Sequence, residues 1–435
     1  MCIYKDKGDD RGCDRGTGTV SQYCDTVPVP LSHPLSSPLS LYIHIPFCVR
    51  KCSYCDFLSG PQDEQTRERY VEALIREICM YGDNSREVDT IFLGGGTPSI
   101  LEGDQIRRIM QAVFDSFSVR KDAEISMELN PGTADRKKLQ AFRQAGINRL
   151  SMGVQSMHDE ELRMLGRIHS HAQAVETFKA AREEGFGNIN IDLMSALPGQ
   201  TFESWACTLE EAAAWGPEHI SAYSLIIEPG TPFDEWQDKG MLPPLPDEET
   251  DREMYHYTRS FLQGRGYDRY EISNYARPGR ECRHNTGYWT GHDYLGMGIG
   301  AASYVDGTRF TNTEDIQQYM DFFELNQDHR DYLELNKGKI ESGAGSPAGP
   351  GIRRDVHRLE TEEKMEEFMF LGLRMTGGVS PEDFKTRFGR PLDEVYGEMI
   401  RKHESQGLVE RTDEGIRLTE RGTDISNYVL ADYLF

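Results

Sequence analysis

The sequence predicts an α/β fold: six βα units forming a partial barrel, followed by a small winged-helix-like domain. Two observations carry this prediction. First, six apolar, strand-like runs alternate with segments of helical periodicity between residues 41 and 227, a pattern typical of a parallel sheet with crossover helices. Six units are too few for the closed eight-fold barrel but sufficient for an open one. Second, helical patterns precede two short strand-like runs near the end of the chain.

The strand-like runs and the helical stripes define the expected elements of the barrel. The six runs are Leu41–Ile45, Thr90–Leu93, Ile125–Leu129, Arg149–Val154, Ile189–Ala196 and His219–Ile227. Apolar stripes at helical spacing lie between them, formed by Val71, Leu74, Ile75 and Ile78, and by Ile106, Ile109, Met110 and Val113. Parallel α/β folds bind ligands outside the carboxyl ends of the strands, so functional residues are expected just after each strand.

Composition divides the rest of the chain into further segments. Residues 1–38 are rich in Asp, Gly, Ser, Thr and Pro and are predicted to be a disordered leader. The barrel is expected over 39–275, then a connection over 276–335 and a Gly-rich linker or insertion over 336–352. Residues 353–435 form the expected winged-helix-like domain. Its acidic start favours a packing role over DNA binding; the acidic residues are Glu362, Glu363, Glu366 and Glu367.

The charge and the hydropathy of the chain exclude several function classes. The 435 residues include 48 Lys and Arg against 72 Asp and Glu, a formal net charge of −24. An acidic chain repels phosphate backbones, so binding of nucleic acid is not expected. No stretch approaches the roughly 18 apolar residues of a membrane span. The first 40 residues lack the apolar segment of a signal peptide, so the cytoplasm is the expected location.

Three of the nine cysteines form a motif. Cys48, Cys52 and Cys55 have C-x3-C-x2-C spacing directly after the first predicted strand. Three thiolates leave one iron of a four-iron cluster open, whereas a structural zinc needs a fourth ligand, for which His44 is a candidate. We favour the cluster. The cysteines of the leader are expected to be unordered thiols, and Cys79 and Cys207, in predicted helices, are expected in the core.

Further motifs accompany the cysteines in a fixed order. They are Leu41-Tyr42-Ile43-His44-Ile45-Pro46-Phe47-Cys48, Gly94-Gly95-Gly96-Thr97-Pro98-Ser99, Glu128-Leu129-Asn130-Pro131-Gly132, Ser151-Met152-Gly153-Val154-Gln155-Ser156, Leu165-Gly166-Arg167, Asn190-Ile191-Asp192-Leu193-Met194 and His284-Asn285-Thr286-Gly287-Tyr288-Trp289. Together they resemble the radical S-adenosylmethionine (SAM) superfamily and, within it, the family of oxygen-independent coproporphyrinogen III oxidase and the heme chaperone HemW. The resemblance runs from Leu41 to the C-terminus, apart from the insertion.

The resemblance implies a [4Fe-4S] cluster on the three cysteines and SAM on the open iron, where one-electron reduction would yield a 5′-deoxyadenosyl radical. It also implies a set of SAM contacts, namely Tyr42, Tyr54, Gly95, Gly96, Thr97, Glu128, Gln155, Arg167 and Asp192. Two alternatives stay open from the residues alone. Asp192 is flanked by apolar residues and is costly to bury unless paired, and a salt bridge with Arg149 or Arg167 would serve as well as a ligand. Tyr54 is equally suited to packing against the cluster.

Three observations separate the oxidase from the chaperone. The oxidase carries a fourth cysteine two residues after the third, where this chain has Phe57. Residues 1–38 show no pattern of the ordered N-terminal arm of the oxidase. The pattern HNxxYW is associated with heme binding in HemW-type proteins. It implies heme contacts from His284, Asn285, Tyr288 and Trp289, with Cys282 and His292 as alternative axial ligands.

We therefore expect a chaperone that binds heme and passes it to apoproteins, among which respiratory proteins are candidates. Oxidative decarboxylation of coproporphyrinogen III is the alternative activity, and no catalytic residue is assigned. The sequence leaves open whether the chain forms a homodimer.

Overall fold

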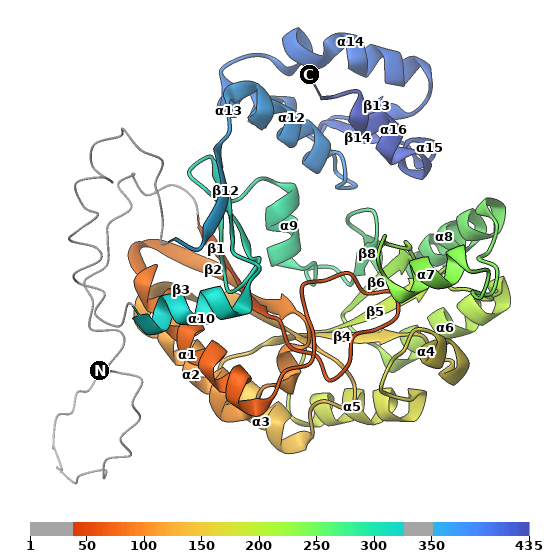
Figure 1. Cartoon of the computed structure of the whole chain (residues 1–435). Coiled ribbons are helices and arrows are strands. Elements are labelled where there is room, and N and C mark those ends of the chain that lie inside the picture. The colour runs from red at the N-terminus through yellow and green to blue at the C-terminus, as the bar shows by residue number, and fades with distance from the viewer. Residues whose placement is uncertain (1–37, 326–350, 435) are drawn as a thin grey trace, which may run out of the picture.

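The structure is a computed structural model and describes residues 38–325 and 351–434 (Figure 1). The predicted leader, up to residue 37, and the predicted insertion, up to residue 350, lie outside the described residues. Within these residues, no helix combines the length and the apolar character that crossing a bilayer requires.

Twelve strands form one sheet in the order β12-β11-β10-β9-β1-β2-β3-β4-β5-β6-β8-β7. Their bounds are β1 (Leu39–Ile45), β2 (Asp83–Gly95), β3 (Phe117–Leu129), β4 (Arg149–Gln155), β5 (Ile189–Ser195), β6 (His219–Ser224), β7 (Asp268–Arg269), β8 (Asn274–Ala276), β9 (Tyr294–Met297), β10 (Ala302–Val305), β11 (Thr308–Asn312) and β12 (Arg353–Arg358). Strands β1 to β6 are parallel neighbours in chain order. They coincide with the six predicted strands, so the partial α/β barrel is confirmed. A seventh strand, β9, adds to β1 in parallel.

Helices connect the parallel strands and lie along one side of the sheet (Figure 1). They are α1 (Glu64–Met80), the short 3-10 helix η2 (Pro98–Ile100), α2 (Gly103–Ser116), α3 (Arg136–Gln144), α4 (Asp159–Met164), α5 (His171–Glu183) and α6 (Phe202–Trp215). Helix α1 begins where Asp63 accepts a hydrogen bond from the Thr66 amide, satisfying one of the free N–H groups of the first turn. All residues of the two predicted stripes, on α1 and α2, are at most 1% exposed. The apolar stripes therefore hold these helices on the sheet, as predicted.

Cys207 corrects one prediction. It lies exposed on α6, not in the core. The buried face of this helix is set by Trp205, Leu209 and Ala212, spaced four and three residues apart. Two residues after Trp205, Cys207 falls on the opposite face of a helix with 3.6 residues per turn. Cys79, at the end of α1, is buried in the core as expected.

The remaining helices of the barrel region are α7 (Pro232–Asp238), α8 (Glu248–Gln263), α9 (Arg283–Trp289) and α10 (Ile316–Leu325). The whole HNxxYW pattern lies in α9, which is placed between the sheet and the C-terminal domain (Figure 1).

The C-terminal domain has its own hydrophobic core. It consists of α12 (Thr361–Gly372), α13 (Pro381–Phe388), α14 (Leu392–Ser405), the hairpin β13 (Val409–Arg411) and β14 (Ile416–Leu418), α15 (Glu420–Asp424) and α16 (Ser426–Ala431). Helices followed by a hairpin are the expected winged-helix-like order. Residues Arg353–Arg358, predicted to begin this domain, instead form β12, which pairs with β11 of the large sheet. The ion pair between Glu367 and Arg309 (2.8 Å) joins α12 to β11 and fits a packing role for the acidic start.

Candidate functional site

A cavity of about 660 Å³ occupies the interior of the partial barrel. The three cysteines line it at the carboxyl ends of the strands, and His284, Asn285 and Tyr288 of α9 line it at the opposite end. We call the cysteine end, where the rim residues Phe57 and Ile226 are exposed, the mouth, and the α9 end the floor. All nine predicted SAM-contact residues line this cavity. The chain therefore brings together residues that lie 150 positions apart in sequence.

The cysteine loop follows β1 and is held by backbone hydrogen bonds to neighbouring loops. The Ser53 amide donates to the Leu165 carbonyl (3.0 Å), and the Ser53 carbonyl accepts from the Phe233 amide (3.0 Å). The three thiols are half-buried. The Thr97 hydroxyl lies 3.4 Å from Cys48 Sγ, and Arg167 Nη1 donates to Cys52 Sγ at 3.6 Å. A hydroxyl and a guanidinium beside sulfur stabilise thiolates, so this donor set fits an anionic iron–sulfur cluster.

His44 does not complete a zinc site. Its Nδ1 atom lies 3.0 Å from the Tyr42 hydroxyl, and its Nε2 atom lies 3.0 Å from the Leu58 carbonyl oxygen. Both ring nitrogens are thus occupied by neighbours within the barrel. Among the described residues, no three Cys, His, Asp or Glu side chains converge as ligands of a single ion.

The Gly94–Gly96 turn packs tightly against the end of β1. Gly95 has a φ of 112°, and a Cβ atom there would lie 2.4 Å from the His44 ring. At Gly96 a Cβ atom would lie 2.8 Å from the Phe47 carbonyl oxygen. The glycines are therefore required by the neighbouring strand, in addition to the approach of a ligand for which the sequence suggested them. The Gly95 amide donates to Glu128 Oε2 at 3.0 Å, which fixes that carboxylate.

Arg167 links three parts of the mouth. Besides Cys52, its guanidinium donates through Nη2 to Asn130 Oδ1 and to the Gly153 carbonyl, both at 2.6 Å. A Cβ atom on Gly153 would meet the Asn130 oxygen at 2.8 Å, so glycine makes room for this contact. Gln155, at the end of β4, has a φ of 70°, an uncommon conformation for a side-chain-bearing residue that is enriched at functional sites.

Two buried carboxyl groups face the middle of the cavity. Asp192 accepts hydrogen bonds from Asn190 Nδ2 (2.7 Å) and Ser151 Oγ (3.3 Å). The suggested ion pair with Arg149 or Arg167 does not form within 4 Å in the described part of the chain. Burial raises the pKa of both carboxyl groups, that of Glu128 to about 8, where the charge of Asp192 adds to the rise and the Gly95 amide opposes it. Protonation at neutral pH lets Glu128 remain buried without a cation.

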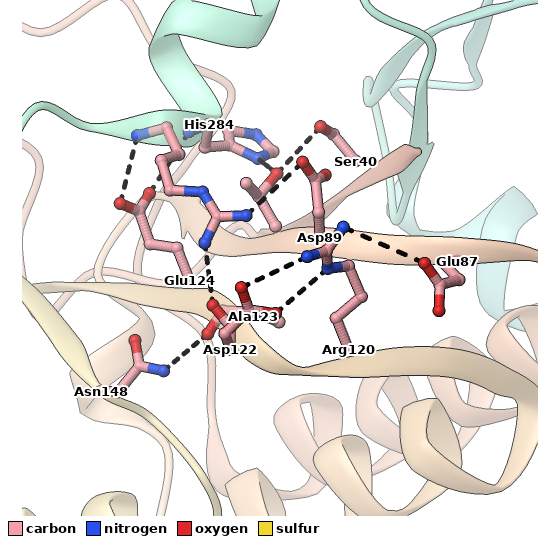
Figure 2. Close-up of polar contacts among 11 residues, drawn as sticks. Ser40, Glu87, Asp89, Arg120, Asp122, Ala123, Glu124, Asn148 and His284 are labelled. Atoms are coloured by element: carbon pink, nitrogen blue, oxygen red, sulfur yellow. Dashed lines mark hydrogen bonds and ion pairs between the residues drawn. The ribbon is translucent and has the colours of Figure 1, made fainter. Parts of the chain in front are cut away.

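The floor of the cavity is formed by α9, which Glu124 holds in place (Figure 2). Glu124 accepts from the amides of Arg283 (3.1 Å) and His284 (3.2 Å), two free N–H groups of the first turn of α9. The His284 ring is fixed on both sides. Its Nδ1 atom lies 2.8 Å from the Thr90 hydroxyl and its Nε2 atom 3.0 Å from the Tyr288 hydroxyl. Burial lowers the pKa of His284 to about 3, so the imidazole is neutral.

Trp289 is separated from the other residues of its motif. It does not line the cavity, and the Arg374 guanidinium lies 4.6 Å from its ring centroid. Arg374 follows α12, so Trp289 faces the C-terminal domain while His284, Asn285 and Tyr288 face the barrel interior. His292, an alternative axial ligand, is exposed, and Cys282 is fully buried beside Glu124 (3.5 Å).

The sequence analysis did not assign several polar residues to the cavity lining or its floor. Arg149 is fully buried and lines the cavity. The ring of His219 bonds to Asn190 Oδ1 (2.6 Å) and to the Tyr270 hydroxyl (2.8 Å). The sequence does contain a pattern that indicates these polar residues. Polar residues occupy alternate positions in strands that are otherwise apolar, which indicates a polar barrel interior; the pairs are Glu124 with Ser126, Arg149 with Ser151, Asn190 with Asp192, and His219 with Ser221.

The fold and the cysteine loop define a class, and comparisons with known proteins agree with it. Residues 42–212 match the radical SAM superfamily, and residues 359–425 match the HemN C-terminal domain. The fold is similar to a solved structure of coproporphyrinogen III oxidase (HemN) from Escherichia coli, with a TM-score of 0.74 at 24% identity over 91% of this chain and 90% of that chain. The chain is therefore a radical SAM protein.

Curated relatives narrow the class to a family. The heme chaperone HemW of Bacillus subtilis (strain 168) is 37% identical over 398 residues, which cover 91% of this chain and 99% of the relative. HemW of Escherichia coli (strain K12) is 41% identical over 293 residues, covering 65% and 76%. A mitochondrial radical S-adenosyl methionine domain-containing protein 1 of Danio rerio is 32% identical over 409 residues, covering 91% and 86%. The chain belongs to the HemW family, as its motifs predicted.

Proposed function

We propose that this chain is a heme chaperone, which binds heme and transfers it to apoproteins while carrying a [4Fe-4S] cluster and SAM. The observation that carries the proposal is the identity to HemW of Bacillus subtilis along 91% of this chain. Because the identity spans both the barrel and the C-terminal domain, it supports a function of the whole chain and not of the superfamily domain alone.

Cys48, Cys52 and Cys55 would hold the cluster. Their loop lies at the carboxyl ends of the parallel strands, where this fold binds ligands. Thr97 and Arg167 each place a donor beside a thiol, which favours the thiolate that iron requires. When bound, the cluster and SAM would supply one-electron chemistry at the sulfonium.

The residues around the middle of the cavity would hold SAM. The positive charges of bound SAM would favour the ionised forms of Glu128 and Asp192, which are disfavoured by burial in its absence. Gln155 and Arg167 would position SAM through their fixed side chains. Tyr42, Tyr54, Gly95, Gly96 and Thr97 complete the proposed contacts. The role of these residues is to bind and orient SAM and to exclude water around it.

The heme contacts proposed from the HNxxYW pattern are His284, Asn285, Tyr288 and Trp289. For His284 to bind iron through Nε2, the Tyr288 hydroxyl must first move away, because it occupies that atom. A His284→Ala variant with an unchanged heme spectrum would remove this ligand assignment without touching the chaperone proposal. The proposal includes transfer of heme to acceptor proteins that are not identified. It also includes self-association as a homodimer.

Coproporphyrinogen III oxidation is the second candidate, favoured by the fold shared with the oxidase. Phe57 argues against it, because the oxidase has a cysteine at this position. One experiment separates the two. Protein purified without oxygen and reconstituted with iron and sulfide is titrated with hemin, and the same sample is assayed with coproporphyrinogen III, SAM and a reductant. We expect saturable hemin binding without turnover. Formation of protoporphyrinogen IX would overturn the chaperone proposal.

A further inference from the structure

Arg149 is a buried cation whose hydrogen bonds are almost all unmade. It begins β4 at the floor end of the barrel, is 1% exposed and lines the cavity. Its guanidinium makes one long hydrogen bond, from Nη1 to the Ser126 hydroxyl at 3.5 Å, and its Nε atom is buried without an acceptor in the described part of the chain. No carboxylate of the described residues lies within 4 Å of it, and Glu124 and Asp192 act on it only from longer range. Buried charges are normally paired and hydrogen bonded, so this one lacks a partner.

The charge of Arg149 persists in spite of its burial. Burial lowers the pKa of Arg149, but the neighbouring acidic groups, with Cys282 and Glu124 foremost, raise the pKa above its usual value. A guanidinium carries five N–H donors in a planar fork and accepts no hydrogen bond. The fork matches the two oxygens of a carboxylate. Arg149 therefore offers the cavity a preformed site for an anion.

The α9 end of the cavity also presents aromatic surfaces. The Phe92 ring lies 5.2 Å from the His284 ring at an interplanar angle of 25°, and the Tyr288 ring lies 5.0 Å from His284 at 85°. Phe92 and Tyr288 both line the cavity. Burial and, after it, the charge of Arg149 lower the pKa of His284 to about 3, which places the guanidinium close to α9. Flat rings and one buried cation suit a ligand with a flat apolar body and carboxylates along one edge, which is the chemistry of heme with its two propionates.

The carboxylate of SAM is the other anion in the proposed complex. The family resemblance places that carboxylate on the open iron of the cluster, at the mouth. Gln155 ends β4 at the mouth, six residues after Arg149, and a strand rises about 3.3 Å per residue, so the two residues lie about 20 Å apart along β4. Arg149 is thus placed for a ligand beside α9 and not for the group that binds the cluster.

We infer that Arg149 binds a propionate of the heme held by the HNxxYW residues of α9. The inference rests on the proposed function, which supplies heme and its contacts on α9, and it adds the residue that recognises the acidic edge of the macrocycle. The propionate accepts hydrogen bonds from the guanidinium and supplies the partner that the chain itself leaves out. Arg149 then orients the porphyrin in the cavity and selects porphyrins whose propionates are free.

The test compares hemin with hemin dimethyl ester, in which both propionates are esterified. Cluster-reconstituted full-length protein is titrated with each ligand in the same mild detergent. We expect the wild type to prefer hemin about tenfold or more, as one charge-assisted hydrogen bond requires. Arg149→Met should weaken hemin binding by the same factor and leave binding of the ester unchanged, so that the preference is lost. Arg149→Lys should keep part of the preference, because lysine retains the charge without the fork.

Arg182→Met is the matched control, since Arg182 lies on α5, pairs with Glu218 at 2.8 Å and does not line the cavity. It should retain the full preference for hemin. Arg149→Gln takes the place of Arg149→Met if that variant does not fold, and the same loss of preference is expected. Iron and sulfide contents show whether each variant carries its cluster, and equilibrium dialysis with SAM measures the binding of that ligand separately.

The outcomes separate the inference from the proposed function. A wild type that binds hemin and its ester equally overturns the inference without any variant. Weaker binding of both ligands by Arg149→Met overturns it as well and makes Arg149 a structural residue. An Arg149→Met protein that keeps its preference for hemin and loses SAM assigns the guanidinium to SAM. Absence of hemin binding by the wild type overturns the proposed function itself. Loss of preference in Arg149→Met, with unchanged affinity for the ester and for SAM, supports a propionate on Arg149.

Discussion

The two ends of the cavity carry similar residues in different roles. Glu124 and Glu128 lie four residues apart on β3 and both point into the barrel. Glu124, at the floor, accepts hydrogen bonds from the first turn of α9 (Figure 2). Glu128, toward the mouth, has a single backbone donor, the Gly95 amide. The floor therefore uses its carboxylate to fix an element of the fold, whereas the mouth keeps its carboxyl group available for a ligand.

The contrast extends to the neighbouring side chains. At the floor, histidine rings are tied on both nitrogens, as for His284 and His219. At the mouth, thiols are half-buried and Gln155 has a left-handed backbone. The two ends are connected, since His219 bonds to Asn190, which donates to Asp192 at 2.7 Å. A polar residue inside this barrel is therefore not by itself a ligand site, because residues such as Glu124 and His219 bond to other parts of the fold.

The largest expected effect is the loss of the cluster at the mouth of the cavity. Cys55→Ala should abolish cluster assembly, because only two thiolates would remain on the loop and a cubane cluster cannot be held by two. The measurement is iron and sulfide content, with visible absorbance, after reconstitution without oxygen. Cys207→Ala is the matched control, since it removes an exposed thiol on α6 and should keep full iron content. Full iron content in Cys55→Ala would contradict the cluster assignment.

The next largest expected effect is a loss of stability at the floor of the cavity. Glu124→Ala should lower the free energy of unfolding by about 3 kcal/mol, because two buried amides of α9 lose their acceptor and Arg149 loses a nearby negative charge. The measurement is urea unfolding of the apoprotein. Asp122→Asn, on an exposed residue of the same strand, should change stability by less than about 0.5 kcal/mol. A loss below about 1 kcal/mol for Glu124→Ala would show that α9 is held by other contacts.

A third prediction concerns Glu128 and the dependence of folding stability on pH. Its pKa is raised from 4.5 to about 8 by burial. Between these values the unfolded chain loses the proton and the folded chain keeps it, so stability falls as pH rises from about 5 to 8. Glu128→Gln should remove this fall, and the variant should gain on the wild type by about 3 kcal/mol between pH 5 and pH 7.5. The measurement is apoprotein unfolding at both pH values.

Glu160→Gln is the control for this titration, because the Glu160 side chain is 92% exposed. Its stability should follow that of the wild type at both pH values. If Glu128→Gln and the wild type differ by the same amount at pH 5 and pH 7.5, Glu128 is ionised in the folded protein and the contrast with Glu124 fails.

The parallel core was predictable because its strands are long apolar runs separated by helical stripes. Strands β9 to β12 have only four to six residues and mix polar with apolar positions. Their place in the sheet depends on pairing with distant segments, which local periodicity does not report. Cys207 was misplaced for a related reason, since a helix pattern identifies the helix before it fixes which face is buried.

Within the candidate site, too, local patterns were predictable from the sequence and tertiary contacts were not. The spacing of Cys48, Cys52 and Cys55 predicts a cluster loop because it is a local pattern with specific chemistry, and the structure brings the three thiols to one end of the cavity. The HNxxYW pattern predicted a group of residues but not their directions. Trp289 turns toward Arg374 because α9 is packed between two domains, and that packing is a property of the tertiary structure. Arg149 was named only as a salt-bridge partner, although it lines the cavity.

The smallest expected effect decides whether His284, at the floor of the cavity, can bind the heme iron. Tyr288→Phe removes the hydroxyl that occupies Nε2 of His284, and loss of one buried hydrogen bond should cost about 1 kcal/mol of stability. The same change leaves a neutral imidazole nitrogen facing the cavity. If His284 is only a structural residue, the hemin affinity and the Soret band of Tyr288→Phe should equal those of the wild type. Tyr428→Phe provides a control for the loss of a hydroxyl.

A tighter hemin complex with a shifted Soret band in Tyr288→Phe would mean that Nε2 reaches the iron once it is released. The floor would then be a latent ligand site and not a wall, and the distinction between the two ends of the cavity would fail at the residue where it is now clearest. An unchanged spectrum leaves His284 as a structural residue, since its two hydrogen bonds to Thr90 and Tyr288 already account for its buried, neutral ring.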